Sequence, residues 1–138
     1  MDRRKLQQLA DLRLKDAEVL LAAGQWDAAY YLLGYCVECA FKACIAQQFL
    51  LHTIPEKGLV NSFYTHRLDE LLVTSNLKKA LTAHTAVDAS FKANWDNVKD
   101  WNESVRYDIK VKDVDAWALY AAVADLDSGL LSWLQKYW

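Results

Sequence analysis

The sequence predicts an all-α fold, an antiparallel helical bundle of four to five helices in one domain covering 1–138. Its 138 residues include one proline and four glycines, so few positions interrupt a helix. Apolar residues recur three and four positions apart, as they do along one face of a helix. Only Tyr107 to Val111 alternates as a strand would, and no second run could pair with it. Hydrophobic residues make up 54% of the chain while the mean hydropathy is -0.09, which is typical of amphipathic helices.

Two long helices are expected first. The first should run from about Asp2 to Ala23, with Gly24 as its stop, because a glycine just past the last turn adopts the left-handed cap. Its inward face should carry Leu6, Ala10, Leu14, Ala17 and Leu21. Asp27 is the expected N-cap of the second helix, which should reach about His52, before Pro55. That helix is apolar on nearly all sides and is therefore predicted to be central, with Gly34 marking the close approach of a neighbouring helix.

The second half of the chain predicts shorter helices and one long last helix. Residues 55–58 indicate a turn, and Thr65 should cap a third helix. A fourth helix is expected over Ala86 to Trp101, a break at 102–104, and an extended connection from Val105 to Lys112. Asp113 should then cap the last helix, with these residues facing inward: Trp117, Tyr120, Ala121, Ala124, Leu131 and Leu134.

Composition narrows the functional classes. The formal net charge is -2 and the pI is about 5.9, so any nucleic acid must bind at a localised site and not over a basic surface. The longest stretch without a charged residue, Ala43 to Pro55, is shorter than the roughly 20 residues that span a bilayer. With no secretory pattern at the N-terminus and three cysteines, we expect a cytoplasmic protein with free thiols and no membrane partner. The usual phosphate-loop, hydrolase-triad and carboxylate-metal motifs do not occur, and we predict no cofactor and no metal.

A polar stripe runs along the second helix. Tyr31, Tyr35, Glu38 and Lys42 follow each other at spacings of four, three and four, so they share one face. Glu38 and Lys42 stand four residues apart, in the favourable order for an ion pair. A glutamate in a buried helix needs such a cation.

Four segments together resemble the HEPN domain family, which in bacteria and archaea is associated with RNA-related toxin modules. They are Trp26–Tyr31 (WDAAYY), Val37–Ala43 (VECAFKA), Thr65–Leu71 (THRLDEL) and Ser104–Tyr107 (SVRY), in the order and spacing of the family pattern. The resemblance implies a helical bundle. It also implies a homodimer, often with a nucleotidyltransferase-type protein partner.

The family's ribonuclease motif is incomplete in this sequence. In many members an arginine is followed, after four to six residues, by a histidine, and the pair cleaves RNA without metal. Arg106 matches the arginine, but Val111, Lys112 and Asp113 occupy the histidine window and no histidine follows His84. The resemblance therefore implies a nucleotide-, RNA- or partner-binding component of a toxin–antitoxin-like module. Two alternatives stay open: an active metal-independent ribonuclease toxin using Arg106, and a purely structural protein-interaction module.

The candidate site residues follow from the stripe and from the resemblance. Arg106 is the candidate catalytic residue, and the candidate ligand-binding residues are Glu38, Lys42, His66, Arg106 and Tyr107. Glu38 either orients Arg106 towards a phosphate or forms a structural ion pair with it. His66, in the first turn of a helix, either touches a ligand phosphate or packs against a neighbouring helix.

Two further residue sets have a functional and a structural interpretation. Cys36 and Cys39 form a C-x-x-C pattern, which in other proteins binds zinc or carries out redox chemistry. Because this pattern lies within a helix, we expect both cysteines to be core residues. The many aromatic residues suit base stacking, core packing or a dimer interface, and we expect the last two uses for most of them.

Overall fold

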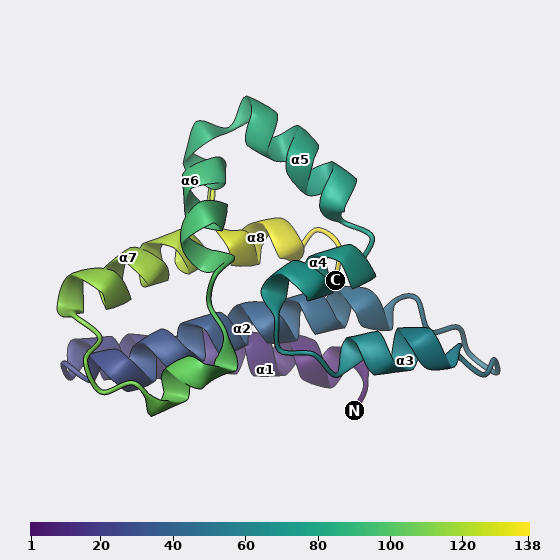
Figure 1. Ribbon diagram of the computed structural model, residues 1–138, viewed down its shortest axis with the longest axis horizontal. Helices are drawn as coiled ribbons and strands as arrows, with labels where there is room; N and C mark the ends of the chain where they lie inside the picture. The colour runs from purple at the N-terminus through teal and green to yellow at the C-terminus, as the bar shows by residue number, and fades with distance from the viewer.

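The computed structural model describes residues 1–138 and contains eight α-helices and one 3₁₀-helix, with no β-strand (Figure 1). The elements are α1 (Arg3–Ala22), α2 (Trp26–Ala46), α3 (Lys57–Phe63), α4 (Leu68–Thr74), α5 (Lys78–Val87), α6 (Ala89–Val98), the 3₁₀-helix η1 (Glu103–Tyr107), α7 (Asp113–Ala124) and α8 (Leu130–Leu134). The all-α class is confirmed. The structure has eight helices where four to five were expected, because the chain after α2 folds into several short ones.

The first two helices form an antiparallel hairpin. Asp2 caps α1 by accepting a hydrogen bond from the backbone N–H of Lys5. Gly24, at φ +72°, ends the helix as predicted. Asp27 does not cap α2, which begins one residue earlier, at Trp26. Its carboxylate instead accepts a hydrogen bond from the backbone N–H of Val111, 84 residues later, and so ties the segment before α7 to the start of α2.

Helix α2 is central, as predicted. It packs against α1, α4, η1, α7 and α8, and most of its residues are buried. It ends at Ala46 and not near His52. After Ala46, the side chain of Gln48 donates a hydrogen bond to the carbonyl of Thr74, and the chain folds into a turn around His52, at φ 63°. By length and composition α2 is also apolar enough to cross a membrane, and 67% of its most apolar window is buried inside the fold.

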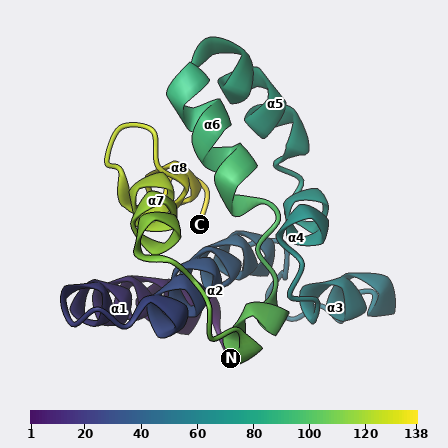
Figure 2. The ribbon, with the colours of Figure 1, turned by 60° about the vertical axis from the view of Figure 1, so that its left-hand side comes forward.

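Four short helices follow α2. Helix α3 begins at Lys57, within the expected turn at 55–58, and α5 lies almost wholly before the predicted fourth helix, where no helix was expected. Thr65 does not cap α4 directly; its hydroxyl accepts a hydrogen bond from the backbone N–H of Arg67, the residue before the helix. Helix α6 is shorter than the predicted fourth helix and is capped by Asp88. The α5–α6 pair projects from the α1–α2 hairpin and contacts α7 and α8 (Figure 2).

The expected long last helix is broken in two. Helix α7 starts at Asp113 and ends at Ala124, and α8 starts only at Leu130. Because α7 and α8 are separate helices, their buried faces need not continue one another along a single helix. The inward positions of α7 are Ala116, Leu119, Ala122 and Val123. The predicted inward positions Trp117 and Ala121 are exposed, and Tyr120 and Ala124 are half-buried. Leu131 and Leu134 are buried as predicted.

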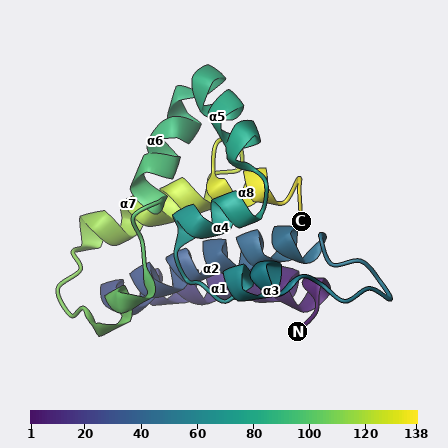
Figure 3. The ribbon, with the colours of Figure 1, turned by 45° about the vertical axis from the view of Figure 1, so that its right-hand side comes forward.

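The two chain ends and the α2–α3 loop lie at one end of the molecule (Figure 3). The side chain of Gln47 donates a hydrogen bond to the carbonyl of Tyr137, which joins the end of α2 to the C-terminal turn. The opposite end holds the α1–α2 turn and the start of α7 (Figure 1).

Candidate functional site

The polar stripe of α2 (Tyr31, Tyr35, Glu38 and Lys42) lies under η1 and the segment before α4. The rings of Tyr31 and Tyr35 stack, with centroids 6.1 Å apart and planes 3° from parallel. Tyr31 also lies 6.0 Å from the indole of Trp101, which follows α6. The half-buried tyrosines therefore lie between η1 and the buried, charged residues of the stripe, Glu38 and Lys42.

Glu38 is the buried anion of this region. Its side chain is 3% exposed, and one carboxylate oxygen, Oε1, meets both Lys42 Nζ at 2.8 Å and His66 Nδ1 at 2.9 Å. The Glu38–Lys42 ion pair predicted from sequence is thus confirmed. The ammonium of Lys42 also lies over the ring of Phe63, 5.3 Å from its centroid. Burial of the carboxylate is tolerable because two side chains from different elements meet it.

The contact with Glu38 determines which nitrogen of the His66 ring carries the proton. An ionised carboxylate only accepts hydrogen bonds, so the proton must be on His66 Nδ1. In the neutral ring Nε2 is then an acceptor, and it makes no hydrogen bond within the protein. The side chain is 49% exposed, so the ring reaches the surface of the protein. A carboxylate that orients a histidine in this way is common in proton-transfer sites, and it also serves to hold two elements together.

Arg106 and Tyr107 lie at the end of η1, and both are exposed. The guanidinium of Arg106 is 4.9 Å from the centroid of the Tyr107 ring, and it forms no ion pair with any carboxylate. Tyr107 and, to a smaller extent, Tyr31 raise the pKa of Arg106, so the guanidinium stays a cation. The site thus offers an unpaired positive charge beside an accessible aromatic ring.

The expected ion pair between Glu38 and Arg106 is absent. Arg106 is placed near Tyr31, and Tyr31 and Glu38 are seven residues apart on α2, about 10 Å along the helix axis. The partners of Glu38 come instead from its own helix and from His66, 28 residues later. The structure therefore separates the candidate residues into two groups: Glu38, Lys42 and His66, and Arg106 with Tyr107.

Trp101 fixes the position of η1 on α2. Its buried indole lies directly on Gly34, where an added Cβ would be 2.0 Å from Trp101 Cε2. A close approach at Gly34 was predicted for a neighbouring helix; the structure shows a close approach there, but the side chain of Trp101, between α6 and η1, makes it. The indole Nε1–H is buried without a hydrogen-bond partner. Asn102 then starts η1 by accepting a hydrogen bond from the backbone N–H of Ser104.

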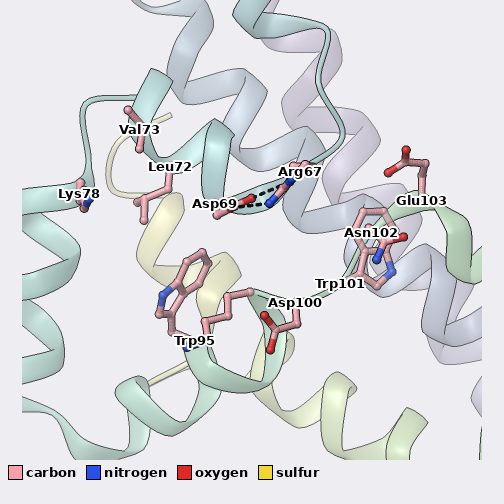
Figure 4. Close-up of a pocket in the computed structure, with 11 residues that line it drawn as sticks. Arg67, Asp69, Leu72, Val73, Lys78, Trp95, Asp100, Trp101, Asn102 and Glu103 are labelled. Carbon is pink, nitrogen blue, oxygen red and sulfur yellow. Dashed lines mark hydrogen bonds and ion pairs between the residues drawn. The ribbon is translucent and has the colours of Figure 1, made fainter.

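A groove of about 690 Å³ lies next to the site, between α4, the start of α5 and the end of α6 (Figure 4). Its lining includes Trp95 and Trp101 together with charged residues of both signs: Arg67, Asp69, Lys78, Lys99, Asp100 and Glu103. Arg67 is bound to Asp69 at 3.1 Å, so part of this charge is already neutralised. No functional role was predicted for these charged residues from the sequence, because they are distributed over α4, α5, η1 and the segments beside them.

The cysteines are core residues, as predicted. All three are free and buried, and burial raises the pKa of each thiol, to about 11 for Cys39 and about 12 for Cys44. A thiol held neutral in this way is a poor nucleophile and a poor metal ligand. The structure contains no group of three or more His, Cys, Asp or Glu side chains that could hold a metal ion.

Comparison with known proteins gives no assignment: no family model, curated protein or solved structure matches this chain.

Proposed function

We propose that this chain is a HEPN-type helical bundle that binds single-stranded RNA or a nucleotide through Arg106, without efficient catalysis. One observation carries the proposal: an exposed guanidinium with no carboxylate partner lies beside the exposed ring of Tyr107. The guanidinium lies over one face of the ring, so a phosphate would meet the cation while a base would stack on the other face, and proteins commonly bind single strands through such contacts. The half-exposed side chain of His66 adds a further polar group nearby, held by the buried Glu38–Lys42 pair of α2.

The cellular setting follows from the resemblance and is part of the same proposal. We place the protein in the cytoplasm as a homodimer, in a toxin–antitoxin-like module with a nucleotidyltransferase-type protein partner. The free thiols agree with a reducing compartment. The net charge of -2 agrees with a single local binding site and not with general nucleic-acid binding.

A second candidate function, a metal-independent ribonuclease, is favoured by the Glu38–His66 contact. His66 Nε2 would supply the acid/base group that is missing after Arg106. His66 contacts Glu38 and Arg106 lies near Tyr31, and these two positions of α2 are about 10 Å apart along the helix axis, so no contact joins the histidine to the arginine. For this reason we rank binding above cleavage.

Fluorescence anisotropy with a labelled single-stranded RNA tests the proposal, alongside gel analysis of the same RNA with and without divalent metal. Arg106→Ala should weaken binding at least about tenfold, the effect of losing one charge-assisted contact of about 1.5–3 kcal/mol. Lys15→Ala is the matched control, because it removes one exposed cation from α1, and it should bind like the wild type.

The outcomes separate the candidates. Binding without cleavage, lost in the Arg106 variant, supports the proposal. Cleavage that is lost in both Arg106→Ala and His66→Ala establishes the ribonuclease instead. RNA binding that is unchanged in Arg106→Ala contradicts the proposed role of Arg106. The absence of both binding and cleavage in the wild type contradicts both candidates and leaves a protein-interaction module.

A further inference from the structure

The loop between α2 and α3 exposes aliphatic side chains that the fold does not use. Leu50 is 69% exposed, Leu51 87% and Ile54 96%, and we name these three residues the apolar tip. The loop is closed by the backbone N–H and the hydroxyl of Thr53, which both donate to the carbonyl of Leu50. His52 holds a left-handed conformation there. The tip is therefore a formed turn that presents its side chains outward.

Basic side chains lie at the same end of the molecule as the apolar tip. The start of α1 packs against the end of α2 and against α3, since Met1 and Leu6 line one apolar cavity with Phe49 and Phe63. This packing brings exposed cations to the same end of the molecule as the tip (Figure 3). We name them the basic collar: Arg3, Arg4, Lys5 and Lys57.

The charge at this end is opposite to that of the whole chain. The collar carries four cations, none of them in an ion pair. Two acidic residues lie beside it, Asp2 and Glu56, and the carboxylate of Asp2 is engaged in capping α1. The protein as a whole has a formal net charge of -2. The molecule is thus polarised, with a positive, apolar end.

We infer that this end docks on an anionic lipid bilayer, with the apolar tip entering the interface and the basic collar meeting the headgroups. Exposed aliphatic groups gain by leaving water, and clustered Lys and Arg are attracted to anionic lipids. The expectation of no membrane partner rested on the longest uncharged stretch, Ala43 to Pro55, being too short to span a bilayer. Docking at the surface needs no spanning segment.

Two other partners, a second copy of this chain and a nucleic acid, fit this surface less well than an anionic bilayer does. In a symmetric dimer the same patch would face itself, so the two collars would repel each other. A nucleic acid would meet the collar but would gain little from three aliphatic side chains. An anionic bilayer uses both parts of the surface.

Co-sedimentation with phosphatidylcholine vesicles, with and without phosphatidylserine, tests the inference on the full chain. The wild type should bind the phosphatidylserine vesicles and bind the neutral vesicles much more weakly. Leu50→Ser/Leu51→Ser/Ile54→Ser should lower the partition coefficient at least about tenfold, because the apolar area no longer enters the interface. The matched control is Val19→Ser/Val87→Ser/Leu126→Ser, which removes equally exposed aliphatic side chains elsewhere and should bind like the wild type.

The collar has its own variant. Arg3→Gln/Arg4→Gln/Lys5→Gln should weaken binding to phosphatidylserine vesicles on the order of 100-fold, whereas Lys15→Gln/Lys92→Gln/Lys110→Gln should not. Circular dichroism melting confirms that each variant is folded. The inference is overturned if the wild type ignores phosphatidylserine vesicles, or if the tip variant binds as the wild type does. It is also overturned if the tip variant converts a dimer to a monomer, which would make the surface a self-association site. None of these results depends on RNA binding at Arg106.

Discussion

The indole of Trp101 rests on Gly34 so closely that position 34 has no room for a side chain. The nearest ring atom, Cε2, would be 2.0 Å from a Cβ at that position. Because η1 begins two residues after Trp101, this contact determines where Arg106 sits on α2. Glycine at position 34 lowers the helix propensity of α2, but it leaves the space that the Trp101 indole occupies.

Gly34→Ala should destabilise the fold by about 1–3 kcal/mol, since the indole must move out of its place. The gain in helix propensity, up to about 1 kcal/mol, offsets only part of this cost. Urea unfolding measures the difference. Gly58→Ala in α3 is the control: an added Cβ there meets nothing within 4 Å, so stability should stay the same or rise. Equal effects of the two substitutions would show that Trp101 does not pack as described.

The Glu38–Lys42 pair should be strongly coupled. Lys42→Leu alone leaves a buried carboxylate with only His66 beside it and should cost about 3–5 kcal/mol of stability. Glu38→Leu/Lys42→Leu should cost clearly less than the sum of the two single substitutions. The exposed pair Lys92–Asp96, also four residues apart, is the control and should couple by less than about 1 kcal/mol. Additive effects at Glu38 and Lys42 in urea unfolding would contradict the buried pair.

Stability should decline at alkaline pH. Burial raises the pKa of Cys39 from 9.0 to about 11 and that of Tyr35 from 10.0 to about 12. Since both groups ionise earlier in the unfolded chain, their contribution is complete below pH 9.0 and is lost as the pH rises towards about 12. The free energy of unfolding, measured across this range, should fall. Cys39→Ala/Tyr35→Phe should flatten the decline, and an equally steep decline in that variant would assign the effect to other groups.

Local patterns were enough to predict most of the α1–α2 hairpin. The stop at Gly24, the inward face of α1 and the central place of α2 all follow from spacing and composition. The break between α7 and α8 also had a local signal that was missed. Asp125 accepts a hydrogen bond from the N–H of Asp127, and a Cβ at Gly129 would be 2.3 Å from the carbonyl oxygen of Asp125. This is the chemistry of a tight turn, which overrode the apolar periodicity on either side.

The site was less predictable, because its contacts join distant parts of the chain. The Glu38–Lys42 pair has a local spacing and was predicted. The contact of His66 with Glu38 spans 28 residues, and no local pattern indicates it. The expected Glu38–Arg106 pair came from resemblance alone, and the packing of Trp101 places Arg106 near Tyr31 instead. Long-range packing, and not helix periodicity, decides which polar groups meet.

The salt dependence of RNA affinity tests most directly whether Arg106 binds phosphate. For a single strand, each neutralised phosphate contributes about -0.7 to the slope of log K against log salt concentration. Arg106→Ala should therefore make the slope shallower by about 0.7 relative to the wild type, whereas Lys15→Ala should leave it unchanged. A slope in the Arg106 variant equal to that of the wild type would contradict the phosphate contact, and with it the proposed function.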